Sequence, residues 1–330
     1  MKFELKLFRN SGDIEYNQKD SMADSHKVHQ IKIIAAFAVI YLVWGSTYIA
    51  IRFSIETIPP FLMAGLRFVF SGLLLFGWTY QKDRVLPRAR EIRKSAFVGI
   101  LLLVGGNGTL TWSEQYIPSG LAALILAMIP VWMVWLDSIF VTKKRPQTIV
   151  IIGILLGVAG VALLSGVNRS VLLDKAHPES SVFFYALMLV GAGLSWSSGS
   201  LYSRTIKSAA SLLTLVSTQM LAGGLVLIII GSVLGEWDRF SVREISLLSL
   251  VSVLYLIVFG SILTYTAYNW LLRHSAPAKV GTYAFFNPLV AVFLGWLLAN
   301  EPVTLKMMIG AGTILTAVIL VNQSQWFQRK

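Results

Sequence analysis

Two stretches of sequence decide the fold, WGSTYIAIR at Trp44–Arg52 and WSSGSLYSR at Trp196–Arg204. When the two are laid over each other, the opening Trp, the Ser in third place and the closing Arg coincide. Farther along, LILAMIPVWMVWL and TYAFFNPLVAVFL match through Pro130 and Pro288, and each Pro lies in the middle of its apolar stretch. Because the matching features recur in the same order, the chain is predicted to contain two copies of one unit.

The composition predicts a membrane protein. The chain has 330 residues, of which 55% are hydrophobic and only 13% are charged, and its mean hydropathy is +0.69. The apolar residues form blocks close to the ~20 residues that a membrane-spanning helix needs. The blocks are 31–51, 61–80, 95–112, 119–141, 148–166, 182–202, 212–233, 247–271, 277–299 and 306–322. They do not alternate as barrel strands do, so we expect an all-α integral membrane protein with ten transmembrane helices.

The charge pattern predicts the orientation. If ten spans alternate from a cytoplasmic start, most of the 28 Lys and Arg residues fall in segments on the cytoplasmic side. Cytoplasmic segments are enriched in these residues, so both termini are expected in the cytoplasm. The net charge of +12 then reflects membrane orientation, and no nucleic-acid partner is predicted.

The duplication predicts a domain organisation of two five-helix units, residues 31–166 and residues 182–322. Because five is odd, the second unit enters the membrane from the opposite side, as in the inverted repeats of many secondary transporters. The other segments are a disordered cytoplasmic tail over residues 1–30, with Met22 as an alternative start, an external linker over 167–181 and a cytoplasmic tail over 323–330.

This layout resembles the EamA family of the drug/metabolite transporter superfamily over essentially the whole chain after residue 30. The resemblance rests on WGSTYIAIR, on AGLRF at Ala64–Phe68, on Pro130 and Pro288, and on NEPVTLKMMIGAGTIL at 300–315. It implies export of small metabolites, amino acids or drug-like compounds, with the last helix of each repeat at the periphery. The first repeat has TKKRP at Thr142–Pro146 where the family often has a Glu, which either weakens any role for that Glu in this chain or leaves it to Glu301 alone.

Several chemistries are disfavoured by what the sequence lacks. There is no Cys, and the four His residues fall in the tail, in loops or at a helix end. A thiolate or histidine metal site within the membrane is therefore not expected. No G-x-x-x-x-G-K-[ST] motif is present to bind ATP. We predict no enzyme activity, no cofactor and no metal.

Polar and aromatic side chains at helical spacing mark a candidate substrate site. They recur at i, i+4 intervals, which places them on one face of each helix, and a transporter site is expected where such faces meet between two repeats. The alternatives are aromatic belts at the membrane surface and hydrogen bonds between packed helices. The predicted substrate-binding residues are Trp44, Tyr48, Asn107, Thr111, Trp196, Tyr265, Asn269, Tyr283 and Asn287.

The two prolines are candidate hinges or gates. Pro130 and Pro288 each remove a backbone hydrogen bond and free a carbonyl one turn earlier in the helix. In lipid that carbonyl needs another partner, so it is expected to face a cavity or a hinge. The alternative is a static kink that improves packing.

Four ionisable residues are candidate charge contacts: Arg52, Arg67, Glu114 and Asp137. Either arginine could hold a substrate carboxylate if it faces the cavity. The alignment that pairs the two Trp residues also pairs Arg67 with Gln219. Asp137 is a candidate for coupling or gating, because ionisable groups in membrane spans are costly to keep there. The alternative for Asp137 is a surface ion pair with Lys143, Lys144 or Arg145.

Small residues suggest close helix packing. Gly153, Gly157 and Gly160 in one peripheral helix, with Gly310 and Gly312 in the other, have the spacing of close helix contacts. They favour packing within the scaffold or a homodimer.

The sequence thus predicts a multi-pass secondary transporter of the inner (plasma) membrane that exports a small solute by alternating access. Its partners are a small-molecule substrate and membrane lipid. The substrate is expected to be partly apolar, and either aromatic or cationic, because aromatic walls suit stacking and cation–π contacts. One alternative is a nucleotide-sugar or organic-phosphate exchanger, which needs deep basic residues. Another is a membrane scaffold subunit that transports nothing, whose polar stripes would face lipid or dry helix contacts.

Overall fold

The computed structural model describes residues 8–143, 145–164 and 182–327, and every regular element among them is helical. The predicted linker at 167–181 lies outside the described residues. The first half of the chain forms α1 (Phe8–Ser54), α2 (Pro60–Asp83), α3 (Ala89–Gly99), η1 (Ile100–Gly108), α4 (Thr109–Ser113), α5 (Ser119–Leu126), α6 (Ile129–Leu136), η2 (Asp137–Val141) and α7 (Thr148–Leu164). The second half forms α9 (Val182–Ser203), α10 (Leu212–Val233), η4 (Glu236–Arg239), η5 (Val242–Glu244), α11 (Leu247–Tyr255), η6 (Leu256–Tyr265), α12 (Thr266–His274), α13 (Pro277–Val280), α14 (Tyr283–Ala299) and α15 (Leu305–Phe327).

Seven segments of the described chain are long and apolar enough to cross a membrane. They are Val28–Ser54, Pro60–Lys82, Ala89–Ser113, Ser119–Val141, Val182–Ser203, Leu212–Val233 and Leu247–His274. Three shorter apolar helices, Thr148–Leu164, Phe286–Ala299 and Leu305–Val321, lie where the sequence predicts the fifth, ninth and tenth spans. That these three also cross the membrane stays a prediction.

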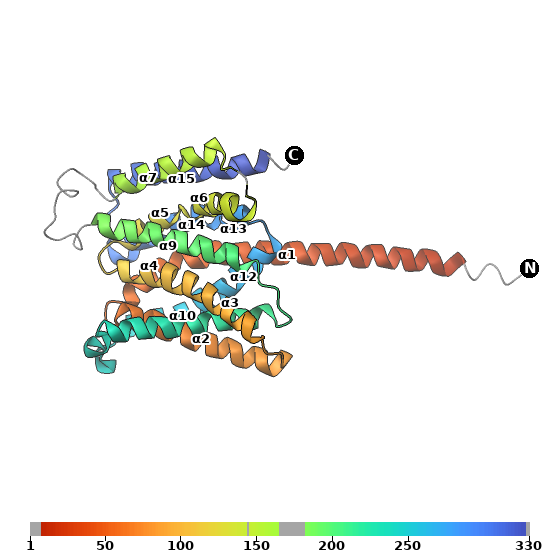
Figure 1. Ribbon diagram of the computed structural model, residues 1–330, viewed down its shortest axis with the longest axis horizontal. Helices are drawn as coiled ribbons and strands as arrows, with labels where there is room; N and C mark the ends of the chain where they lie inside the picture. The colour runs from red at the N-terminus through yellow and green to blue at the C-terminus, as the bar shows by residue number, and fades with distance from the viewer. Residues whose placement is uncertain (1–7, 144, 165–181, 328–330) are drawn as a thin grey trace, which may run out of the picture.

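Helix α1 extends well beyond the bundle at its N-terminal end (Figure 1). Residues 8–30 continue it, although the sequence predicts a disordered tail over residues 1–30. The helix can extend through these residues because no Pro, which would break it, occurs before Pro59. We call the side from which this extension projects the tail side, and the opposite side, where α1 ends at Ser54, the loop side (Figure 1).

The two halves of the chain pack in a reciprocal pattern. At one edge of the bundle α2 packs on α10, and at the opposite edge α7 packs on α15, so each of these helices meets its own counterpart (Figure 1). In the interior α1 packs on α14, while its counterpart α9 packs on α5 and α6. This exchange of equivalent contacts is what a pseudo-two-fold axis between two halves produces.

Glycine pairs lie where counterpart helices cross. A Cβ built on Gly65 of α2 would lie 2.9 Å from the carbonyl oxygen of Gly224 in α10. A Cβ built on Gly224 would lie 2.8 Å from the carbonyl oxygen of Gly65. A Cβ on Gly160 of α7 would lie 3.1 Å from the carbonyl oxygen of Gly310 in α15, and a Cβ on Gly310 would lie 3.2 Å from the carbonyl oxygen of Gly160. Only glycine allows two backbones to approach this closely. Because each crossing joins counterpart helices, α2 with α10 and α7 with α15, the pseudo-two-fold axis passes between the helices of each pair.

The predicted hinge prolines occupy different settings. Pro130 is the second residue of α6, just after a turn at Ala127–Met128 that separates α5 from α6. Pro288 lies inside the unbroken α14, and the turn in its half comes earlier, at Gly281–Thr282. The two regions touch, because a Cβ on Gly281 would lie 3.2 Å from Cβ of Pro130. Both halves therefore contain a break in the equivalent helix, and the hinge role stays a prediction.

Matching π-helical segments occur in the two halves. Segment η1 (Ile100–Gly108) and segment η6 (Leu256–Tyr265) lie at equivalent places in the third and seventh long apolar segments. A π-helix bonds each N–H to the carbonyl five residues earlier and is frequent at functional sites. The sequence pattern predicts ordinary α-helices there, so these segments are a finding of the structure.

Candidate functional site

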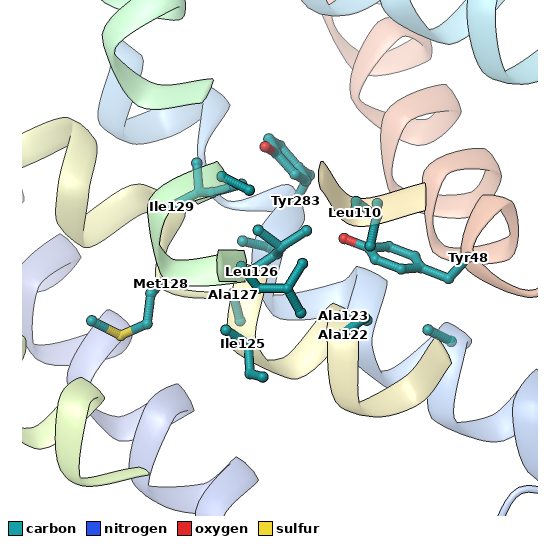
Figure 2. Packing of buried hydrophobic residues seen from close by; sticks show 14 of the residues in the cluster. Tyr48, Leu110, Ala122, Ala123, Ile125, Leu126, Ala127, Met128, Ile129 and Tyr283 are labelled. Atoms are coloured by element: carbon teal, nitrogen blue, oxygen red, sulfur yellow. The ribbon is translucent and has the colours of Figure 1, made fainter. Parts of the chain in front are cut away.

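A central cavity lies between the two halves of the chain, with about 520 Å³ of atom-free space that includes space open to the outside. Both halves supply its wall: Trp44, Thr47, Tyr48, Arg67, Gly106, Asn107, Leu110, Leu126 and Ile129 from the first, and Ala192, Trp196, Tyr283 and Asn287 from the second. Figure 2 shows the part of this wall beside the break between α5 and α6. Seven of the predicted site residues line the cavity: Trp44, Tyr48, Arg67, Asn107, Trp196, Tyr283 and Asn287.

Four rings form what we call the aromatic cluster: Trp44, Trp196, Tyr268 and Tyr283. The centroid of Trp44 lies 5.5 Å from that of Trp196, 4.9 Å from Tyr268 and 5.1 Å from Tyr283. These separations suit edge-to-face and tilted aromatic contacts. Trp44 and Trp196 are counterparts in the two halves, so their contact also lies close to the pseudo-two-fold axis.

Hydrogen bonds orient the aromatic cluster. The indole nitrogen of Trp196 donates to the hydroxyl of Tyr268 at 3.0 Å, and this hydroxyl is 2.6 Å from Ser200 Oγ. The indole nitrogen of Trp44 is 3.4 Å from the carbonyl oxygen of Gly260 in η6. Tyr268 is not among the predicted site residues, although it follows Tyr265 by three positions and could have been chosen from the same helical face.

Arg67 reaches the cavity from the middle of α2. Its side chain is only 3% exposed, and its Nε donates to Ser261 Oγ of η6 at 2.8 Å. Within the described part of the chain, its Nη1 is buried and has no hydrogen-bond partner. The guanidinium carbon lies 4.7 Å from the ring centroid of Phe68. The counterpart residue Gln219 is also buried, but it accepts a hydrogen bond from Tyr265 at 2.6 Å.

Asn107 and Asn287 bring amide groups to the wall. With its amide nitrogen facing the two carbonyls, Asn287 donates to the backbone oxygens of Tyr283 and Tyr41, both at 3.2 Å. It therefore joins α14 to α1 as well as lining the cavity. Asn107 lies in η1, and its Oδ1 is 3.5 Å from Thr111 Oγ1.

Three predicted substrate-binding residues are not part of the cavity wall. Thr111 is fully buried beside Asn107. The Tyr265 hydroxyl donates to Gln219, and Asn269 Nδ2 donates to the carbonyl oxygen of Tyr265 at 2.9 Å. These contacts lie away from the cavity wall, so a substrate role for the three stays a prediction that needs a different conformation.

Two predicted charge contacts, Arg52 and Glu114, meet at the loop side, outside the cavity. Arg52 Nη1 donates to the backbone oxygen of Glu114 at 2.6 Å, and this ties α1 to the end of α4. The Glu114 side chain is 0% exposed, and neither carboxylate oxygen has a hydrogen-bond partner among the described residues. Tyr48 and Glu301 also lie near this carboxylate.

Asp137 lies on the tail side, at the start of η2, and is half-buried. The cation that acts on it is Arg204, at the end of α9. Asp137 lies outside the cavity wall. Among the described residues, no three His, Asp or Glu side chains come together as metal ligands would.

Two distant glutamates cap helices on the loop side. Glu301 accepts from the backbone nitrogens of Ser119 and Gly120 at 2.8 and 3.1 Å, at the start of α5. Glu236 accepts from those of Phe61 and Leu62 at 3.2 and 2.8 Å, at the start of α2. Both helices follow a Pro that provides no side-chain cap. A carboxylate at a helix N-terminus satisfies free N–H groups and suits the helix dipole.

Replacing Glu301 with alanine is expected to destabilise the protein by about 1–2 kcal/mol, the usual cost of losing an N-terminal helix cap. Gly295→Ala should act in the same direction, because its new Cβ would lie within contact distance of Glu301 and push the carboxylate away. Thermal unfolding in detergent measures both effects. Glu244→Ala, at an exposed carboxylate on the same side, is the control. Equal melting temperatures for Glu301→Ala and Glu244→Ala would contradict the capping role.

Comparison with known proteins gives the family. The model of the EamA-like transporter family matches the chain twice, over residues 31–166 and 183–323. The inner membrane transporter YedA of Escherichia coli K12, described as uncharacterized, is 36% identical over 298 residues, covering 90% of this chain and 92% of YedA. The transporter YvbV of Bacillus subtilis 168, also described as uncharacterized, is 29% identical over 313 residues, covering 90% of this chain and 93% of YvbV.

A protein known from its crystal structure has the same fold, with a TM-score of 0.61 at 17% identity, over 88% of this chain and 96% of that one. Together with the apolar helices, the similarity to YedA places this chain in the inner (plasma) membrane as a multi-pass protein. The two family matches cover most of the sequence, and the chain therefore belongs to the EamA family of the drug/metabolite transporter superfamily.

Proposed function

We propose that this protein is a secondary transporter that exports small metabolites, amino acids or drug-like compounds, and that the central cavity is its substrate site. The observation that carries this proposal is the cavity itself, with its aromatic and amide wall contributed by both halves. Solute sites of inverted-repeat transporters lie near the membrane midplane between the repeats. Two five-helix inverted repeats over residues 31–166 and 182–322, with both termini cytoplasmic, belong to the same proposal.

The cavity wall suits a small, partly apolar solute. The aromatic cluster offers ring faces and edges for stacking. The amides of Asn107 and Asn287 add a few polar contacts to the mostly apolar lining, as is usual in small-molecule sites.

The helix breaks support an alternating-access mechanism. Between α5 and α6, and between α13 and α14, the chain leaves helical geometry at a few residues beside the cavity. Such short breaks let rigid segments on either side tilt. Opening would then alternate between the tail side, which is the cytoplasmic side in this proposal, and the loop side.

The alternatives fit the cavity less well. An exchanger of nucleotide sugars or organic phosphates has to neutralise a dianion, whereas Arg67 is the one cationic side chain in the described wall. A scaffold that transports nothing has no need of an amide-lined cavity between its halves. The glycines of α7 favour internal packing over a homodimer, since Gly153 and Gly160 contact α15 and Gly157 contacts Met128.

Flux measurements test the function. Purified protein in proteoliposomes is offered amino acids, organic acids and cationic dyes, with and without a pH gradient. We expect saturable transport of at least one class. The absence of saturable transport across the whole panel would argue for the scaffold.

Trp44→Ala is expected to lower transport about tenfold or more, which corresponds to about 1.4 kcal/mol of lost stabilisation. The substitution removes the ring that contacts three other members of the aromatic cluster. Asn287→Ala is expected to impair transport as well, because it removes an amide from the wall. Trp78→Ala, at a ring that is 61% exposed on α2, is the matched control. Normal rates in properly inserted Trp44→Ala and Asn287→Ala would contradict the site assignment.

A further inference from the structure

Arg67 is a buried cation without a counter-charge. Among the described residues its guanidinium makes one hydrogen bond, to Ser261, and no carboxylate pairs with it. A buried charge is expensive unless it is paired and hydrogen-bonded. The unpartnered N–H groups of this guanidinium therefore favour an anionic partner that binds reversibly.

A purely structural role does not require the charge. Gln219 occupies the equivalent place in the other half and joins α10 to η6 through Tyr265 with a neutral side chain. Arg67 joins α2 to η6 through Ser261, across the two halves. The first half thus has a charge and an unpartnered Nη1 where the second half has a neutral amide whose oxygen accepts a hydrogen bond.

The surroundings hold the guanidinium at the cavity. A Cβ on Gly260 would lie 3.0 Å from Nη2 of Arg67 and 3.1 Å from Cγ2 of Thr47, so any larger residue at Gly260 would crowd the group. On the other side, the guanidinium carbon lies 4.7 Å from the Phe68 ring centroid. Both Arg67 and Thr47 belong to the cavity wall, and so does Trp44 of the aromatic cluster.

We propose that Arg67 binds the carboxylate of the transported solute, so that the substrates are small organic monocarboxylates with an aromatic or apolar body. The inference rests on the proposed transport function and narrows it. A guanidinium and a carboxylate match in shape and charge and form strong, charge-assisted hydrogen bonds. The aromatic cluster takes the apolar body. A cationic substrate, which the sequence left open, would have to lie beside this unpaired positive charge.

Binding measurements on the purified full-length protein test the proposal directly. The probes are 3-phenylpropanoate and 3-phenylpropanamide, which have the same shape and differ in charge, with phenylalanine as an amino-acid arm and phenethylammonium as a cation. Quenching of tryptophan fluorescence reports binding, because Trp44 and Trp196 line the cavity. We expect the wild type to bind 3-phenylpropanoate at least about tenfold more tightly than the amide, equal to about 1.4 kcal/mol.

Arg67→Gln, which installs the residue of the other half, should abolish this preference and leave acid and amide within about twofold of each other. Arg67→Lys should retain a weaker preference for the acid, because Lys keeps the charge and loses the planar fork. Arg273→Gln, the same chemical change at an exposed position at the end of α12, should leave the preference unchanged.

Three results with the wild type alone would overturn the proposal. They are equal binding of acid and amide, tighter binding of phenethylammonium than of 3-phenylpropanoate, and no binding of either carboxylate at millimolar concentration. An acid preference that persists in folded Arg67→Gln would also overturn it. Arg67-dependent carboxylate binding without flux in proteoliposomes would leave the binding site standing and reject the transport function. Saturable flux of cations alone would support the transport function and reject the carboxylate site at Arg67.

Discussion

Replacing Gly99 with alanine is expected to prevent the two halves of the bundle from packing. The new Cβ would lie on the backbone of α10, in steric overlap with the carbonyl oxygen of Gln219 and 2.9 Å from its Cα. A backbone cannot rotate away as a side chain can, so α3 and α10 would have to separate. Overpacking of cores costs up to about 3 kcal/mol and occasionally more, and we expect this substitution at or above that figure.

Two other glycines provide matched controls for Gly99. A Cβ on Gly157 would also overlap its neighbour, but that neighbour is the flexible end of Met128, which can move. A Cβ on Gly191 of α9 would meet nothing within 4 Å, so Gly191→Ala should be neutral or stabilising by up to about 1 kcal/mol. Yield and thermal unfolding in detergent measure all three variants. A Gly99→Ala protein as stable as Gly157→Ala would show that α3 and α10 do not pack as described.

Glu114→Gln is expected to stabilise the protein, and to do so more at pH 8 than at pH 5. Glu114 follows the third apolar segment, which ends at Ser113. Burial raises the pKa of its carboxyl well above the usual value of 4.5, the neighbouring Glu301 raises it further, and Arg52 lowers it. Glu114 also follows the C-terminus of α4, where the helix dipole disfavours a negative charge, so α4 does not stabilise the ionised carboxylate.

The sign of the pH effect follows from proton binding. Above pH 4.5 the unfolded chain releases the Glu114 proton while the folded chain retains it, so the free energy of unfolding falls as pH rises toward and through the raised pKa. Each unit of difference between the two pKa values corresponds to about 1.4 kcal/mol. Glutamine carries no titrating proton and removes this contribution. Besides Arg52 and Glu301, the titratable group facing Glu114 is Tyr48.

The comparison uses melting temperatures at pH 5 and pH 8. Glu56→Gln, at an exposed carboxylate on the same side of the bundle, is the control and should show no such difference. If Glu114→Gln changes the melting temperature equally at both pH values, the carboxyl is not held protonated in the folded protein.

Sequence periodicity predicted the cavity well where helices are regular. Trp44 and Tyr48 on α1, and Tyr283 and Asn287 on α14, are spaced by four residues and line the cavity together. The apolar blocks likewise matched the helices, because a run of apolar residues in lipid has few structures available other than a helix.

The three predicted substrate-binding residues outside the cavity wall lie at or just beyond the π-helical segments. Thr111 follows η1, Tyr265 ends η6 and Asn269 lies just beyond it. A π-helix contains more residues in each turn than an α-helix, so residues beyond such a segment point in directions that α-helical spacing does not give. Nothing in the local sequence signals this change, and a substrate role for the three stays a prediction.

Contacts between residues far apart in the chain were also not predicted from the sequence. Glu236 bonds to the backbone of Leu62 across 174 positions, and Arg67 bonds to Ser261 across 194. No short pattern encodes such pairs. The alignment of the halves did pair Arg67 with Gln219, and the structure shows how the two differ: Arg67 carries a charge and a buried Nη1 without a partner, whereas the Gln219 oxygen accepts a hydrogen bond from Tyr265.

The contacts on the pseudo-two-fold axis bear on the balance between the two access states. If the halves exchange conformations during transport, the contact between the counterparts Trp44 and Trp196 is the same in both states. A contact that is equal in two states cannot shift the equilibrium between them. The ratio of the states is therefore governed by the places where the halves differ, foremost Arg67 against Gln219.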